Sequence, residues 1–206
     1  MPTAPVPTVP NHHAGQGEFG GLTGLLAGLS MAFGRSATSS WAIELTGAAP
    51  GDRVVDIGCG PGAAVRYAAR LGIDVVGVDP APQMLRLARR LTRGKHLGTY
   101  VEAGAEALPL DDASAKAAWS IASVHHWSDV ATGVREAHRI LEPGCRFAAL
   151  ERHSRPGAKG LASHGWTDDQ ARQFGDVCVA EGFVDVRIDQ RRTGRRREVI
   201  AVVAQR

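Results

Sequence analysis

Apolar residues along this chain gather in short blocks, separated by stretches in which apolar residues recur at helical spacing. The blocks are rich in valine, alanine and isoleucine, and they predict buried strands over residues 52–57, 74–79, 98–103, 117–124 and 145–151. The stretches around them predict helices over residues 36–46, 63–71, 82–91, 129–141 and 167–182. Thr167 and Gln170 stand at capping-box spacing, which marks the start of the last helix.

Two further apolar runs near the C-terminus depart from this alternation. Residues 184–191 and 198–204 are too close together for a crossover helix, so they predict an antiparallel pair joined by residues 192–196. Strands that alternate with helices pair in parallel. We therefore expect an α/β fold with a doubly wound, Rossmann-like seven-stranded sheet, mostly parallel with an antiparallel C-terminal strand. No repeat or linker divides it, which predicts a single domain over residues 21–206, with residues 21–46 as a helical cover.

Ligands bind to such sheets beyond the carboxyl ends of the strands. The stretch "VVDIGCGPG", residues 54–62, places a glycine-rich turn at such an end, where Gly58 and Gly60 let the backbone approach a ligand closely. Asp79 ends the next strand, about 20 positions after Gly58, where dinucleotide-binding folds place a carboxylate that accepts ribose hydroxyls. The turn and the acid together predict a cofactor that contains adenosine.

Asp56, two residues before the first glycine, discriminates between such cofactors. A carboxylate there would repel the pyrophosphate of a dinucleotide in a pocket of low dielectric constant. S-adenosylmethionine carries no phosphate, and it has an ammonium group and a sulfonium cation. The acid therefore favours S-adenosylmethionine over NAD.

Four segments taken in order are similar to the successive motifs of class I S-adenosylmethionine-dependent methyltransferases, in the branch that acts on small molecules. They are "VVDIGCGPG", "VVGVDPAPQML", "AEALPL" and "AHRILEPGCRF", and the resemblance covers about residues 45–151. It implies that the methionine moiety is bound by Asp56, Gly58 and Gly60, and the ribose by Asp79. The adenine would lie near Pro80, Met84, Ala105 and Glu106. We add Ser123, on the same sheet edge, and Arg35, as a partner for the methionine carboxylate.

The chain departs from the family pattern at two positions. Many relatives carry an acidic residue or serine where Gly104 stands, so the adenine amino group would meet backbone, water or Glu106 instead. Cys145 replaces a glycine that is common in the family, and we interpret it as a small buried residue rather than a nucleophile.

Residues 122–129, "ASVHHWSD", suggest how the methyl acceptor is activated. A neutral hydroxyl must lose its proton, preferably to a group whose pKa is near neutrality, and His125 and His126 are such groups. The segment lacks the Asn/Asp-Pro-Pro-aromatic and Pro-Cys signatures that nucleobase methyltransferases carry there. These features favour O-methylation of a small molecule, such as a saccharide or polyketide-like metabolite. Neighbouring side chains of an extended strand point to opposite sides, so both histidines can face the sulfonium only if the strand has already broken into a turn. We expect one histidine to be catalytic and the other structural, and we favour His126 as the base.

A metal-assisted route stays open at this stage. In quinone-type relatives the matching histidine lies with two acidic residues that hold a divalent metal, and here Ala122 and His125 occupy the acidic places. We therefore expect no metal and an imidazole base, although Glu151 or Asp129 would complete such a site. His12, His13, His153 and His164 are further polar candidates, and Trp127 and Trp166 are either flat acceptor surfaces or core residues.

Composition narrows the alternatives. The 206 residues carry a formal charge of +3, too mild to favour nucleic acid as a partner. The three cysteines are widely spaced, which argues against a disulfide framework or zinc site and favours a cytoplasmic protein. We expect a monomer or homodimer with a small-molecule acceptor. Two alternatives remain: an RNA methyltransferase, suggested by "QRRTGRRRE" at residues 190–198, and a regulatory module that binds the cofactor without catalysis.

The N-terminal region carries no recognisable motif. Residues 1–20 contain several prolines and no basic segment of the signal-peptide type, which predicts a flexible arm. Residues 21–33 are apolar, but they are too short and too rich in glycine to span a bilayer. We expect them to pack on the domain, with a dimer or membrane-surface contact as alternatives, and the whole region to close over the cofactor.

Overall fold

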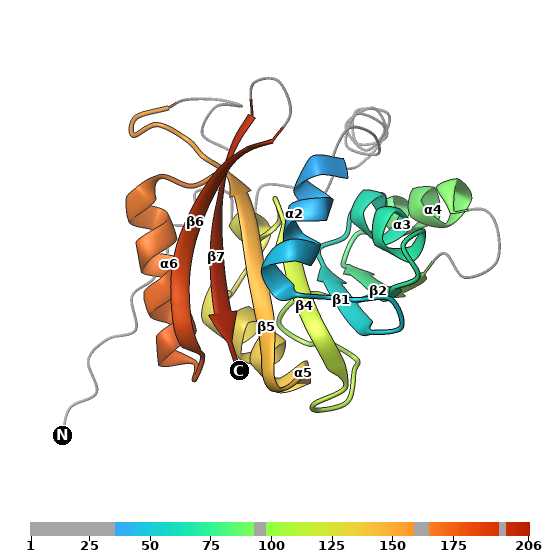
Figure 1. Cartoon of the computed structure of the whole chain (residues 1–206). Coiled ribbons are helices and arrows are strands. Elements are labelled where there is room, and N and C mark those ends of the chain that lie inside the picture. The colour runs from blue at the N-terminus through green and yellow to red at the C-terminus, as the bar shows by residue number, and fades with distance from the viewer. Residues whose placement is uncertain (1–35, 93–97, 159–164, 194–196) are drawn as a thin grey trace.

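The computed structural model describes residues 36–92, 98–158, 165–193 and 197–206, and within these ranges it is a three-layer α/β structure (Figure 1). The elements in chain order are α2 (Ser36–Thr46), β1 (Arg53–Ile57), α3 (Ala63–Ala69), β2 (Asp74–Asp79), α4 (Pro82–Leu91), β3 (Thr99–Glu102), β4 (Ala115–Ile121), the 3₁₀ turn η1 (Val124–His126), α5 (Val130–Ile140), β5 (Leu141–Arg152), α6 (Asp168–Ala180), β6 (Val184–Thr193) and β7 (Arg197–Gln205).

The seven strands form one sheet in the order β3-β2-β1-β4-β5-β7-β6. Strands β1 to β5 pair in parallel, whereas β7 lies antiparallel to both β5 and β6. The predicted α/β fold, with a mostly parallel sheet and an antiparallel C-terminal strand, is therefore confirmed. The chain runs outward from β1 to β3 and then returns to β4, so the strand order reverses between β1 and β4. Ligands of doubly wound sheets bind at the carboxyl edge beside such a reversal.

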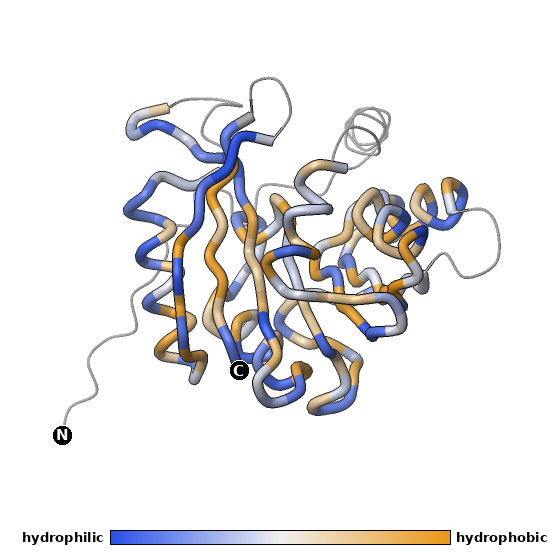
Figure 2. Tube along the Cα trace, viewed as in Figure 1, coloured by the Kyte–Doolittle hydropathy of each residue, from blue (hydrophilic) through white to orange (hydrophobic). Residues whose placement is uncertain are grey.

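Apolar side chains are buried on both faces of the sheet. Helices α2, α3 and α4 cover one face, where Trp41, Val65 and Leu85 belong to the core, and α5 and α6 cover the other, around Phe147 and Phe174. Burial on two faces explains why β1 and β2 read as continuous apolar runs rather than alternating ones. Figure 2 shows the contrast at the end of the sheet, where β7 is hydrophobic and the edge strand β6 is largely hydrophilic.

The structure corrects two of the predicted strand boundaries. The strand expected over residues 117–124 ends at Ile121, because the backbone at Ala122 turns into the left-handed region with φ 54° and residues 124–126 then form η1. Strand β5 begins at Leu141, directly after α5, and not at residue 145, since Gly144 at φ 80° lets the chain bend within the strand.

Helix 36–46 and the capping box at Thr167 and Gln170 are found as predicted. The expected arm over residues 1–20 and the apolar segment over residues 21–33 lie outside the described residues. Among the helices that are described, none is both long and apolar enough to cross a membrane.

Candidate functional site

The glycine-rich turn after β1 needs glycine for two separate reasons. Gly58, Gly60 and Gly62 all have positive φ, at 76°, 53° and 75°, a region that side chains disfavour. A Cβ atom on Gly58 would lie 1.7 Å from the Oγ atom of Ser123, so the turn can pack against the segment after β4 only without a side chain there. A Cβ on Gly60 would meet no atom within 4 Å. The turn is thus packed on one side and open at Gly60.

Asp79 lies at the end of β2, beside this turn. Its Oδ2 atom accepts a hydrogen bond from the N–H of Gly60 at 2.8 Å, and Oδ1 accepts one from the N–H of Ala81 at 2.9 Å. Burial raises the pKa of this carboxyl group, while the two backbone donors act in the opposite direction. Each oxygen has two lone pairs, so one on each remains for a hydroxyl group of a ribose.

The other residues expected at the cofactor lie on β1, at the start of α4 and in the loops after β2 and β3. Asp56 is buried in β1 at 2% exposure, and Met84 is buried at the start of α4, whereas Pro80 is exposed between β2 and α4. Ala105 is buried in the loop that follows β3, at 6% exposure. The glycine turn connects the sequence-predicted residues of β1 and β2 to Ser123 beyond β4, while Arg35 lies outside the described residues.

Neither of the two cysteines near predicted motifs has the properties of a nucleophile. Burial raises the pKa of the Cys59 thiol well above its ordinary value, and the neighbouring carboxylates of Asp56 and Asp79 raise it further. Cys145 is half-buried rather than buried, and its pKa is also raised by desolvation. A thiol whose pKa is raised is mostly protonated near neutral pH and reacts slowly.

Glu106 contacts the segment that carries the histidines. Its Oε1 atom accepts hydrogen bonds from the N–H of Ser128 (2.7 Å), the hydroxyl of Ser128 (2.8 Å) and the N–H of Asp129 (3.1 Å). Its Oε2 atom lies 2.8 Å from the place where a Cβ atom of Gly104 would stand. A side chain at position 104 would therefore require this carboxylate to shift.

The two histidines lie on η1, in different surroundings. The Nδ1 atom of His125 is 3.1 Å from both carboxylate oxygens of Glu151, at the end of β5, and Glu151 is 1% exposed. His126 is exposed, and its ring centroid is 4.0 Å from that of His125. The expectation that the rings point to opposite sides assumed an extended strand, and that assumption is wrong because the strand has ended at Ile121.

The remaining candidates divide between the core and the surface. Trp127 and Trp166 are 5% and 2% exposed and belong to the core, so they are not acceptor surfaces. His153 pairs with Asp168 at 3.3 Å on the surface of the domain. His12, His13 and His164 lie outside the described residues. In the part of the chain that the structure describes, no three or more His, Cys, Asp or Glu side chains are grouped to hold a metal ion.

The pairing of His125 with Glu151 is the feature of this site that sequence reasoning missed. Glu151 was considered only as a possible metal ligand. A signal for the pair was present, because Glu151 directly follows four apolar residues, 147–150, and a glutamate that is buried with such a run must find a partner.

Comparisons with known proteins find relatives of the central part of the chain. The model of a family described as a methyltransferase domain matches residues 55–149. The chain is 40% identical over 91 residues to a malonyl-[acyl-carrier protein] O-methyltransferase of Pseudescherichia vulneris. The matched residues make up 44% of this chain and 35% of that protein. It is 33% identical over 111 residues to a demethylmenaquinone methyltransferase of Tropheryma whipplei, with 53% of this chain and 46% of that protein covered.

The match to solved structures extends over most of the fold. A crystal structure of a SAM-dependent methyltransferase from Aquifex aeolicus superposes with a TM-score of 0.71, covering 87% of this chain and 96% of that one at 15% sequence identity. The likeness at this identity concerns the fold. The chain spans between a third and a half of the length of the two sequence relatives named above.

Proposed function

We propose that this chain, a member of the class I S-adenosylmethionine-dependent methyltransferase family, catalyses transfer of a methyl group to a hydroxyl of a small molecule. The observation that carries the proposal is the hydrogen-bonded pair of His125 and the buried Glu151. His125 lies on the segment against which the glycine turn packs. Such a pair is suited to remove a proton from a neutral hydroxyl beside a cofactor.

The residues around the glycine turn fit S-adenosylmethionine. Asp79 offers one acceptor lone pair on each oxygen to a ribose, and the backbone at Gly60 is open to a ligand. The buried carboxyl group of Asp56 suits an ammonium or sulfonium and would oppose a pyrophosphate. When bound, this cofactor supplies a methyl group on a positively charged sulfur, and the chain's task is to align an acceptor oxygen with it.

The pair of His125 and Glu151 provides the proton acceptor. When Nδ1–H donates to the carboxylate, the neutral imidazole carries its lone pair on Nε2. Nε2 would take the proton of the acceptor hydroxyl, and the cofactor, when bound, would supply the methyl group to that oxygen and leave with a neutral sulfur. The carboxylate stabilises the imidazolium that results, as in other paired histidine bases. His126, which sequence reasoning favours as the base, stays the competing candidate on the same turn.

Two observations favour a small acceptor over RNA. Two arginines of residues 190–198 have side chains that the structure describes, and both pair with acids. Arg191 donates two hydrogen bonds to Glu44 and lies over the ring of Trp41, and Arg192 pairs with Glu198. These two side chains are thus partly neutralised within the domain. The relative from Pseudescherichia is named as an O-methyltransferase, which supports the same type of acceptor atom.

Mass spectrometry of a panel of hydroxylated acceptors tests this function. The panel contains saccharides, polyketide-like phenols and malonyl-acyl-carrier protein, each incubated with the chain and S-adenosylmethionine carrying a deuterated methyl group. We expect a mass increase of one labelled methyl group on the oxygen of one small-molecule class. Labelling of nitrogen or carbon, or of RNA added as a separate arm, would contradict the proposal. Tight cofactor binding with no product in any arm would favour a regulatory module.

A further inference from the structure

The carboxylate of Glu106 joins the loop after β3 to the segment that carries the histidines. Residues 104–106 follow β3 and carry Ala105, which is expected near the adenine. Residues 123–129 carry both histidines. Three hydrogen bonds from Ser128 and Asp129 converge on the Oε1 atom of Glu106, at 2.7, 2.8 and 3.1 Å. Two of the donors are backbone N–H groups, so the contact holds the path of the main chain and not merely a side chain.

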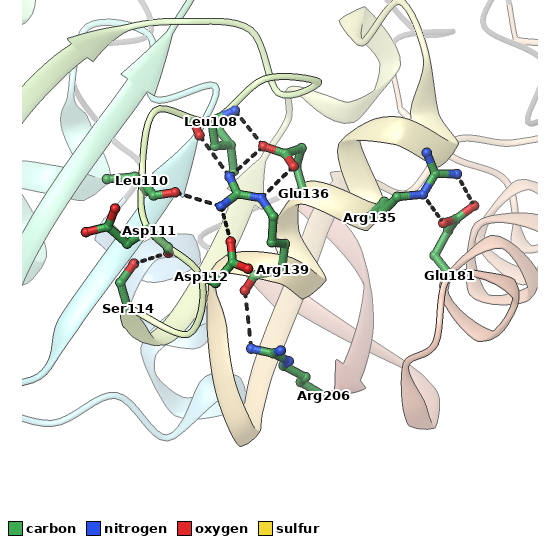
Figure 3. A network of polar contacts seen from close by, with 10 residues as sticks. All are labelled: Leu108, Leu110, Asp111, Asp112, Ser114, Arg135, Glu136, Arg139, Glu181 and Arg206. Carbon is green, nitrogen blue, oxygen red and sulfur yellow. Dashed lines mark hydrogen bonds and ion pairs between the residues drawn. The ribbon is translucent and has the colours of Figure 1, made fainter.

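Helix α5 gives both segments a common frame. Asp129 caps this helix, its Oδ1 atom accepting from the N–H of Thr132 at 3.1 Å. Further along the helix, Glu136 accepts a hydrogen bond of 2.8 Å from the N–H of Leu108. Arg139 donates to the carbonyl oxygens of Leu108 (2.9 Å) and Leu110 (2.7 Å), as Figure 3 shows.

The loop that begins at residue 104 is therefore attached to α5 at both ends. Ala105 and Leu108 are 6% and 4% exposed, so the loop also packs into the core between these attachments. The histidine segment meets the loop at the attachment formed by Glu106. A cofactor that orders the loop would also restrict the histidine segment through the carboxylate of Glu106.

We propose that Glu106 is a positioning residue that couples cofactor binding at residues 104–106 to the ordering of residues 123–129. The inference rests on the proposed function, since it takes the adenine end of the cofactor to lie against Ala105. Segments joined by three hydrogen bonds are ordered together, so a ligand that restricts one lowers the conformational freedom of the other. The histidines are then held in place chiefly when cofactor is bound.

A second contact offers a competing route for the same coupling. The turn at Gly58 packs directly against Ser123, because no side chain separates them. Cofactor bound at the glycine turn would act on residues 123–129 through this contact whether or not Glu106 is present. An experiment on Glu106 must separate the two routes.

Hydrogen–deuterium exchange of the full chain, with and without saturating S-adenosylhomocysteine, makes that separation. The variants are Glu106→Ala and Glu106→Gln, and Glu136→Ala is the matched control, because Glu136 anchors the same loop through a backbone N–H but does not touch the histidine segment. In the wild type, we expect the ligand to slow exchange in residues 123–127 by about fivefold or more, the lower range of coupling between sites.

In Glu106→Ala, with ligand at a concentration that saturates the variant, the slowing should remain in residues 56–62 and disappear from residues 123–127. Glu106→Gln should retain part of it, because an amide oxygen accepts the same hydrogen bonds more weakly. The Glu136→Ala control should respond as the wild type does. If Glu106→Ala does not fold, a reduced response of Glu106→Gln carries the test.

Full slowing of residues 123–127 in both Glu106 variants would overturn the inference and assign the coupling to Ser123 and Gly58. Ligand binding to the wild type with no slowing in residues 123–127 would also overturn it, while leaving the proposed function intact. Failure of the wild type to bind S-adenosylhomocysteine would overturn the proposed function itself, and this inference with it.

Discussion

The Oδ2 atom of Asp79 accepts a hydrogen bond of 2.8 Å from the backbone N–H of Gly60. Asp79, which is expected to bind the ribose, therefore also holds the glycine turn in the conformation that leaves space at Gly60. Recognition of the sugar and the shape of the turn depend on one side chain.

Replacement of Asp79 by alanine should weaken binding of S-adenosylhomocysteine by about 1–3 kcal/mol, because the ribose hydroxyls and the Gly60 N–H lose their acceptor together. Isothermal titration calorimetry measures the change as a loss of about 5- to 150-fold in affinity. Asp74→Ala is the matched control, since Asp74 lies exposed at the opposite end of β2. Equal affinities of wild type and Asp79→Ala would refute the cofactor assignment.

Replacement of Gly58 by alanine should cost more stability than replacement of Gly60. Both positions have positive φ, which costs alanine about 1–2 kcal/mol, but only Gly58 faces Ser123 at colliding distance. Urea unfolding should show the order wild type, Gly60→Ala, Gly58→Ala. Ser123→Gly introduced into Gly58→Ala should recover the part due to the collision, and no recovery would mean that the backbone conformation alone sets the cost.

Replacement of His125 by alanine should lower turnover by about 10²- to 10⁴-fold, the usual effect of losing a general base, while affinity for S-adenosylhomocysteine stays nearly unchanged. Added imidazole should restore part of the activity. Glu151→Gln should lower turnover as well, because a neutral amide stabilises the imidazolium less.

The neighbouring His126→Ala is the comparison for this experiment, assayed with and without a chelator. Loss of turnover in His126→Ala alone would support His126, the base that sequence reasoning favours. Near-normal turnover in both variants would exclude a histidine base, and loss of wild-type activity with chelator would establish a metal.

Replacement of Arg139 by methionine should destabilise the fold by about 1.5–3 kcal/mol, the usual cost of removing hydrogen bonds to charged groups. Arg139 is hydrogen-bonded to Glu136, Asp112 and two loop carbonyls (Figure 3), and the carboxylates of Glu136 and Asp112 raise its pKa. Urea unfolding gives the free energy. Arg135→Met is the control with a smaller expected cost, because Arg135 is largely exposed and pairs with Glu181 alone among the contacts drawn. Similar losses in both variants would show that the Arg139 network adds nothing beyond a surface ion pair.

The pattern of residues was sufficient to predict the order of strands and helices and the glycine-rich turn at the carboxyl end of β1. Burial on both faces makes β1 and β2 continuous apolar runs, and positive φ in the turn after β1 favours glycine. Both features can therefore be recognised from residues that are neighbours in the sequence. Asp79 could be found for the same reason, because its distance from Gly58 along the chain is that of one helix and one strand.

The contacts of His125 and of Glu106 were decided only by tertiary structure. His125 and Glu151 are 26 residues apart, and Glu106 is 22 residues from Ser128, with whole elements between the partners. Parallel pairing brings the ends of β4 and β5 to one edge, which the sequence does predict, but the direction of each side chain depends on where the strand stops. Ala122 leaves the extended conformation at φ 54°, and this single rotation, which the side chains of residues 122–126 do not encode by themselves, turns His125 onto Glu151. Ala122 donates its N–H to the carbonyl oxygen of Leu150 at 2.8 Å, and Ser123 packs against Gly58, so the contacts around this rotation come from β5 and from the turn after β1, far along the chain.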